Sequence, residues 1–142
     1  MKYKKHIVGG TLGIIIGVII LVLYIHFSTA SIIEIIHIPI DLEFQGNMRK
    51  MGFNVDTDGL HFGTLGPGVV GRKDIVLNNT ADEPVRVELK TFGSLRPNIF
   101  YEDNYFILNG NSNRSLMIRA VTPATMKKGF YNSTLRVIFR KI

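Results

Sequence analysis

The chain of 142 residues contains no cysteine and no tryptophan, and it has only five prolines. The lack of cysteine excludes a disulfide framework, a thiolate metal site and a cysteine nucleophile. The length suits one domain of about 100 residues with an appendage, whereas a barrel enzyme needs about 250 residues. Acidic residues are missing from the first 33 positions, although three of the 17 basic residues lie there. This imbalance makes the N-terminus the first region to explain.

A long apolar run follows the basic residues Lys2, Lys4 and Lys5. Residues 7–27 hold no Asp, Glu, Lys or Arg, and a helix over these 21 residues would be about 30 Å long, the thickness of a hydrocarbon core. We therefore predict a transmembrane helix over residues 7–29, with membrane lipid as a partner. Positively charged flanks stay inside, so residues 1–6 are expected to form a cytoplasmic basic tail and the rest of the chain to lie outside.

The same run allows two further interpretations. Ser28 and Ala30 form a small-x-small pair, and cleavage after Ala30 would release a secreted subunit, although the run exceeds the usual signal length of about 7–15 residues. Gly9, Gly13 and Gly17 recur every four residues, a spacing that lets a second helix approach one face closely. The alternative for the glycines is that Gly is simply frequent in membrane helices.

From Ile36 onward, apolar and polar residues alternate, which indicates strands with one buried face. Pro39 places the first of them at a sheet edge, because Pro cannot donate to a central ladder, and we assign residues 30–52 to this edge strand and a connector. Continuation of the helix as far as Ile36 is the alternative. Six further strands are expected over residues 60–64, 72–79, 85–90, 105–108, 115–120 and 131–140. This pattern predicts an all-β antiparallel sandwich of about seven strands over residues 53–142.

The sandwich region resembles a known class of module. The segments that carry the resemblance are residues 60–68 (LHFGTLGPG), 75–78, 84–87 and 129–131. They are similar to immunoglobulin-like (Ig-like) modules of prokaryotic, especially archaeal, cell-surface and membrane-anchored proteins, and the shape also resembles the major-sperm-protein and NPCBM-associated sandwiches. The resemblance covers residues 53–142 and implies a spacer, assembly unit or binder, with no catalytic residues.

One acidic turn resembles the opening of a calcium loop. Asn54, Asp56 and Asp58 supply oxygen ligands at its first, third and fifth positions, and a glycine follows at the sixth. The match fails at the ninth and twelfth positions, which are Phe62 and Leu65. A polar turn whose Asx side chains cap their own backbone is the alternative.

A second set of metal-ligating residue types, His37, Asp41 and Glu43, shares one face of the first expected strand. Three ligands in extended spacing diverge along a strand, so solvated polar positions fit this set better than a metal site. We therefore expect no cofactor.

Three glycosylation sequons begin at Asn78, Asn113 and Asn132, each on the polar side of its expected strand. A domain outside the cell would expose these side chains to a glycosylation system. Surface Asn without sugar is the alternative.

The remaining basic residues recur at strand spacing, as Arg86 and Lys90, Arg114 and Arg119, and Arg136 and Arg140. A nucleic-acid interface would gather them into a patch with base-stacking aromatics, so we predict a solvated sheet face and no nucleic-acid partner. The dense aromatic group Phe100, Tyr101, Tyr105 and Phe106 is expected mostly to pack the core.

No nucleophile elbow, phosphate loop or dinucleotide fingerprint occurs in the sequence, so we expect no enzyme. The sequence predicts a single-pass membrane protein with its sandwich outside the cell and a structural or interaction role in a cell-envelope assembly, through a protein partner or self-association. A carbohydrate- or calcium-linked binding module is the alternative function.

Overall fold

The computed structural model describes the backbone of residues 3–46 and 58–142, and within the helix it describes the side chains of residues 13–26. The chain divides into two compact units, residues 1–32 and residues 33–142. The first unit holds the helix α1 (Tyr3–Ala30). The second unit holds the β-structure, and the site described below lies entirely within it.

Helix α1 includes the apolar run for which the sequence predicts a membrane span. That prediction is not confirmed, since none of the described helical residues form a helix that is both long and apolar enough to cross a membrane. The helix ends at Ala30 and a strand begins at Ile32, so the helix does not continue to Ile36. A Cβ on Gly13 or Gly17 would meet open space, and the surroundings of Gly9 lie outside the described side chains, so helix pairing stays a prediction.

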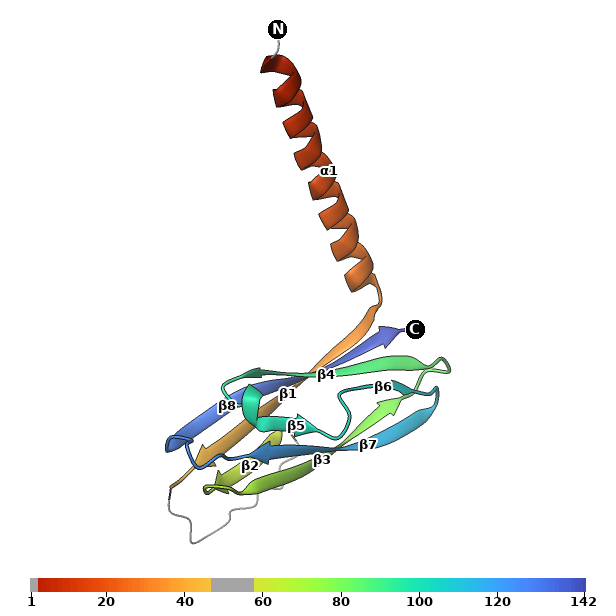
Figure 1. Cartoon of the computed structure of the whole chain (residues 1–142). Coiled ribbons are helices and arrows are strands. Elements are labelled where there is room, and N and C mark those ends of the chain that lie inside the picture. Colours follow the sequence, from red (N-terminus) through yellow and green to blue (C-terminus); the bar gives the residue numbers. More distant parts are fainter. Residues whose placement is uncertain (1–2, 47–57) are drawn as a thin grey trace. The chain divides into compact units, whose positions relative to one another are not determined.

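The described strands form one sheet of five strands and one of three (Figure 1). The five-stranded sheet has the order β2-β1-β8-β4-β6, and the three-stranded sheet has the order β3-β7-β5. The elements are β1 (Ile32–Phe44), β2 (Leu60–Leu65), β3 (Val70–Asn79), β4 (Val85–Gly93), the 3-10 helix η1 (Arg96–Asn98), β5 (Ile99–Tyr101), β6 (Tyr105–Leu108), β7 (Ser112–Val121) and β8 (Gly129–Lys141). The pairs β3–β7, β4–β6, β4–β8 and β5–β7 are antiparallel, and β1–β2 is parallel. A mainly antiparallel two-sheet architecture is thus confirmed, with eight described strands instead of about seven.

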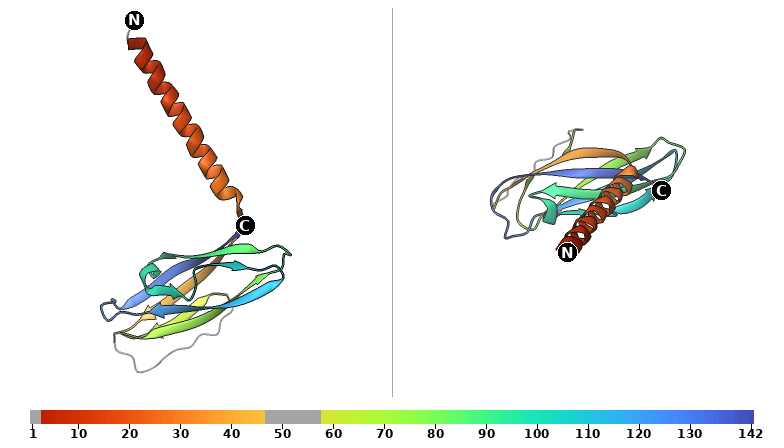
Figure 2. Two further views of the ribbon diagram at one scale, coloured as in Figure 1. Left: turned by 45° about the vertical axis from the view of Figure 1, so that its right-hand side comes forward. Right: turned by 90° about the horizontal axis from the view of Figure 1, so that it is seen from above.

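The core lies between the two sheets and follows the alternation of the sequence. Val87 and Val137 of the five-stranded sheet and Leu116 and Ile118 of the three-stranded sheet are at most 1% exposed. Their neighbours along each strand, apart from Ile138, face outward and are partly or fully exposed. Figure 2 shows the two layers from two further directions. Burial of these apolar faces is the main force that holds the sheets together.

Strand β1 differs from the expected edge strand. It begins at Ile32 and lies between β2 and β8, so the segment predicted to be an edge strand is an interior strand of the larger sheet. Pro39 fits there because pairing with β2 begins only at the next residue, where Ile40 lies opposite Leu60. The register then shifts, and Gly63, with φ +67°, changes the phase of β2 so that Leu65 points inward.

A substitution in β8 tests this core. Leu135→Ala removes a fully buried side chain, and we expect it to lower the free energy of unfolding by about 2–5 kcal/mol through lost burial and a residual cavity. The control Ile107→Ala changes an outward side chain that is 57% exposed, and we expect a change below about 0.5 kcal/mol. Urea unfolding followed by circular dichroism measures both. Equal losses in the two variants would contradict the assigned core.

Candidate functional site

A groove opens where strands of unequal length meet. β1 has 13 residues, β2 has six, and their pairing begins only at Ile40 and Leu60. In residues 3–46 and 58–142, no strand pairs with the first half of β1 on that side. Across the groove lies β3, an edge strand whose sheet neighbour is β7. Edges of two strands from different sheets thus line one groove of about 620 Å³.

Apolar side chains line the groove from both walls. Ile36 and Ile38 line it from β1, and Ile75 and Val76 line it from β3. Ile36 and Ile38 have the phase of the buried Ile40 and therefore continue the core face of β1, yet Ile36 is 38% exposed. A core face left open between two strand edges suits an extended peptide, whose backbone can pair with an edge while alternate side chains enter the groove.

A charged cluster at the β2 end of the groove ties β2 to β1. His61 lies opposite Asp41 in the β1–β2 register, and its Nδ1 contacts Oδ2 of that residue. Its Nε2 lies 3.0 Å from Oδ1 of Asp58, a groove-lining residue. A carboxylate only accepts hydrogen bonds, so both contacts are satisfied when both ring nitrogens carry hydrogen. We call this set, Asp41, His61 and Asp58, the histidine clamp.

The contact between His61 and Asp58 shifts the pKa values of both residues. Hydrogen bonds to Asp58 and then to Asp41 raise the pKa of His61 above its ordinary value. The bond from His61 lowers the pKa of Asp58 below its ordinary value. Both shifts favour the charged pair of imidazolium and carboxylate over the neutral pair.

Two other contacts support the same junction. Oγ1 of Thr64 donates to Oε2 of Glu43 at 2.9 Å, and these residues lie opposite each other in the register. Gly59 allows a close approach, because a Cβ there would stand 2.9 Å from Cγ of Pro39 and 3.0 Å from Nε2 of His61. The start of β2 therefore packs against β1 in a way that a larger residue at position 59 would disturb.

The structure describes only part of the two sets of metal-ligating residue types. Asp58 contacts His61, and Asn54 and Asp56 lie outside the described residues, so the calcium hypothesis stays a prediction. Asp41 and Glu43, expected to be solvated polar positions, are partly exposed and also bond to side chains of β2. Within the described part of the chain, no group of three or more His, Asp or Glu could hold a metal ion.

The three sequon asparagines all have exposed side chains. Asn78 and Asn113 lie directly opposite each other on β3 and β7, and Asn132 is on β8 in the other sheet. Whether they carry sugar stays a prediction.

The aromatic group does not form one platform for a carbohydrate. Phe106 is buried, and Tyr101 is half-buried with its hydroxyl bonded to Thr91. Phe100 and Tyr105 are exposed, but they lie on strands of different sheets.

Sequence reasoning missed both the groove and the histidine clamp. In the sequence, His61 stands alone, because Asp41 is 20 residues away and meets it only through strand pairing. The one available signal is the apolar alternation of β1, which continues upstream of Pro39 through Ile38 and Ile36. This alternation indicates that the core face of β1 extends upstream of Pro39, but it does not indicate that the face is exposed to solvent there.

No protein-family model and no curated protein matches this chain. Among solved structures, the crystal structure of a Burkholderia pseudomallei antigen and type I fimbria protein is similar, with 15% sequence identity and a TM-score of 0.36 over 76% of this chain and 97% of that chain. A similarity of this size carries no argument about the function of this chain.

The histidine clamp predicts a pH-dependent stability. The pKa of His61 is raised on folding, so its contribution is complete below the ordinary value of about 6.5 and is lost as pH rises through the raised pKa. We expect the melting temperature to fall as the pH rises through this raised pKa, and this fall to vanish in His61→Gln. The control His37→Gln changes an exposed residue of β1 and should keep the wild-type profile. Identical profiles for wild type and His61→Gln would contradict the clamp.

Proposed function

We propose that this chain is a membrane-tethered, non-enzymatic β-sandwich that joins a cell-envelope assembly by binding an extended segment of a partner protein in the β1–β3 groove. The observation that carries the proposal is the open core face between two strand edges. The wall formed by β3 comprises four successive residues, 73–76, and at about 3.3 Å per residue it matches a short strand of roughly 13 Å.

The lining of the groove favours a peptide over a small polar ligand. Ile38 and Ile75 pack against the core, whereas Asp58, Lys73 and Asp74 supply charges of both signs around them. Main-chain pairing along an edge would provide affinity, and apolar side chains spaced two apart would provide specificity.

Membrane attachment is the second part of the proposal, and it rests on the sequence. Residues 7–27 carry no Asp, Glu, Lys or Arg and follow three lysines, the arrangement of an anchor with its start in the cytoplasm. An anchor of this kind places the sandwich outside the cell, where envelope partners and a glycosylation system would meet it.

Fractionation of cells that produce the full chain tests the attachment. We expect the chain to stay in the membrane pellet after alkaline carbonate extraction, and protease added to intact cells to remove a C-terminal epitope. Ile16→Asp combined with Ile20→Asp places two charges in the apolar run and should release the chain, because a charge at the centre of a bilayer is costly. Recovery of the wild-type chain in the soluble fraction would contradict the anchor, and an intact mass starting after Ala30 would show cleavage.

A photo-crosslinking amino acid at Ile36, in the groove, tests the binding site. We expect a discrete adduct with a partner protein, and no such adduct from the same amino acid at Ile33, which lies on the opposite face of β1 and is 59% exposed. A synthetic peptide that copies the crosslinked segment should raise the melting temperature of the full chain, since it binds only the folded state. Ile36→Lys should abolish this rise, and Ile33→Lys should not. Equal adducts from both positions, or a peptide without effect, would contradict the proposal.

A further inference from the structure

The outer face of the five-stranded sheet brings like charges together. The β4–β8 register places Arg86 opposite Arg140 and Lys90 opposite Arg136. Like charges directly opposite each other destabilise a sheet. Glu88 lies between the two pairs, with one carboxylate oxygen 2.6 Å from Nζ of Lys90 and the other 3.7 Å from Nε of Arg140. Across β4 and β8, one acid among these four cations leaves a positively charged area. The repulsion between the cations costs stability, and binding an anion would offset that cost.

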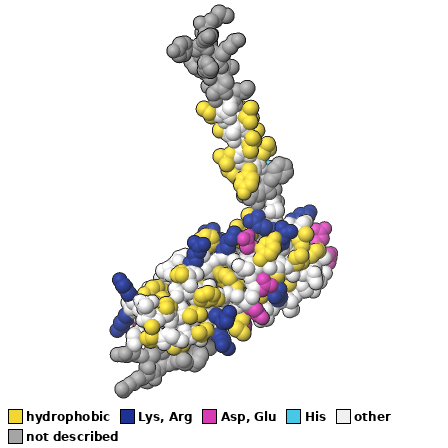
Figure 3. Space-filling view, viewed as in Figure 1, with side chains coloured by type: hydrophobic (Ala, Val, Ile, Leu, Met, Phe, Trp, Pro, Cys, Tyr) yellow, Lys and Arg dark blue, Asp and Glu magenta, His cyan; other side chains and the backbone are white. Residues whose placement is uncertain are grey.

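Aromatic and aliphatic side chains are exposed among these cations. The guanidinium carbon of Arg86 lies 5.7 Å from the ring centre of Tyr105, and that of Arg136 lies 4.2 Å from the ring centre of Phe92. Phe92, Tyr105 and Ile107 are between 43% and 57% exposed. In Figure 3, Lys and Arg side chains gather along the side of the sandwich where Figure 1 labels β4 and β8. The face is therefore both basic and partly apolar, and we call it the basic face.

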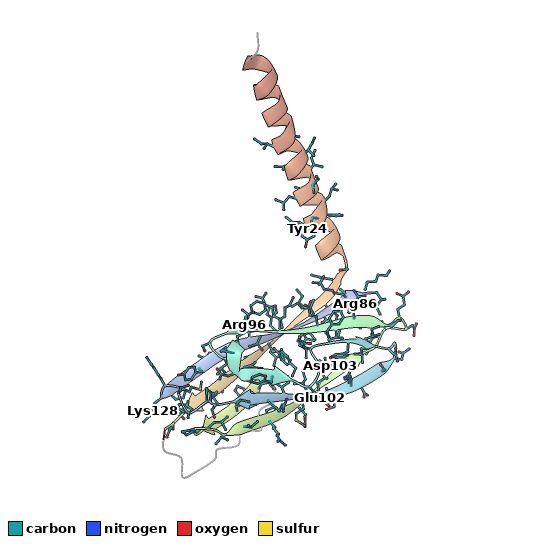
Figure 4. The ribbon with its side chains drawn as sticks, in the orientation of Figure 1. Tyr24, Arg86, Arg96, Glu102, Asp103 and Lys128 are labelled. Carbon is teal, nitrogen blue, oxygen red and sulfur yellow. The ribbon has the colours of Figure 1, made fainter. Side chains whose placement is uncertain are left out.

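A pocket of about 460 Å³ adjoins the basic face. Lys90 and Phe92 line it from β4, and Arg96 lines it from η1. Asn104 and Tyr101 add polar groups, and its described lining includes no Asp or Glu. Figure 4 shows Arg86 and Arg96 on the same side of the sandwich. Two cations around a small polar pocket suit a phosphate group.

We propose that the basic face and this pocket dock on the anionic lipid headgroups of a bilayer surface. Arg and Lys side chains would contact lipid phosphates, as juxtamembrane basic clusters do. Phe92, Tyr105 and Ile107 would enter the interfacial layer, where aromatic side chains with one polar and one apolar end are favoured. A soluble polyanion would bind the cations but would make no apolar contacts with Phe92, Tyr105 and Ile107. The combination of positive charge and exposed apolar side chains therefore favours a bilayer surface.

This inference rests in part on the proposed membrane attachment. α1 ends at Ala30 and β1 begins at Ile32, so one residue joins them, and a residue spans at most about 3.6 Å. An anchored helix would therefore keep the sandwich beside the headgroups at high effective concentration, where a face of modest affinity binds.

The test uses the full chain in lipid nanodiscs, either of phosphatidylcholine alone or with about one third phosphatidylglycerol. The chain has no cysteine, so a single environment-sensitive fluorophore can be attached at Ile107→Cys on the basic face or at Met117→Cys on β7 of the other sheet. Lipids with a nitroxide at the headgroup quench a fluorophore that approaches the bilayer. In anionic discs we expect quenching at position 107 to exceed that at 117 by about twofold, and the difference to disappear in neutral discs or in about 1 M salt.

Paired substitutions provide the matched comparison. Lys90→Gln with Arg136→Gln should abolish the excess quenching at position 107. Arg72→Gln with Arg119→Gln removes the same charge from a cross-strand pair of the other sheet and should leave the excess unchanged. Equal quenching at the two positions in anionic discs, or an excess that survives Lys90→Gln with Arg136→Gln, would overturn the proposal.

Two further outcomes separate this inference from its premises. If the chain does not co-purify with neutral discs, the proposed membrane anchor is wrong. Docking is then tested by flotation with phosphatidylglycerol vesicles, again comparing the fluorophores at positions 107 and 117 and the two paired substitutions. If the fluorophore at position 107 responds to soluble polyphosphate and not to anionic lipid, the face binds a soluble polymer, and docking on a bilayer is wrong.

Discussion

The length of β1 relative to its neighbours is the constraint on which the candidate site depends. β1 carries apolar side chains on its core face from Ile36 to Phe44, but β2 pairs with it only from Ile40 onward. Exposure of an apolar face to water is unfavourable. Beside the first half of β1 no described strand continues the sheet on the β2 side, so this face stays partly exposed between β1 and the edge strand β3. Polar contacts then hold the short β2 in place, through His61 with its two carboxylates and through Thr64 with Glu43. The groove is thus a consequence of strand length, and the clamp marks where it ends.

The two proposed surfaces use different parts of one sandwich. The groove lies between the sheets at β1 and β3, whereas the basic face is the outer side of β4, β6 and β8. β8 separates β1 from β4 in the sheet order, so a partner strand and a bilayer would not compete for the same residues. A sandwich docked through its basic face would keep the groove available, which is the arrangement that a membrane-tethered assembly unit requires.

The sequence predicts much of the fold because alternation reports which face of a strand is buried. Val85, Val87 and Leu89 alternate with Arg86, Glu88 and Lys90, and the structure buries the first set. Pro39 shows the limit of such rules, since it excludes a pairing at one position and not along a whole strand. No comparable pattern in the sequence predicts the short β5 or the parallel pairing of β1 with β2, because both depend on contacts between distant segments. In the sequence the basic residues of β4 and β8 form separate pairs, and only the β4–β8 register makes the two pairs neighbours.

By itself, the sequence determined the class of the fold, the faces of most strands, and the apolar N-terminal run with its basic start. These features follow from local chemistry, namely residue type and spacing along the chain. The tertiary structure decided which strands pair, that β1 is interior, that Asp41 and Asp58 meet at His61, and that one core face remains open. Strand order and register are set by how both sheets bury their apolar faces together, a property of the whole sandwich that no short segment encodes.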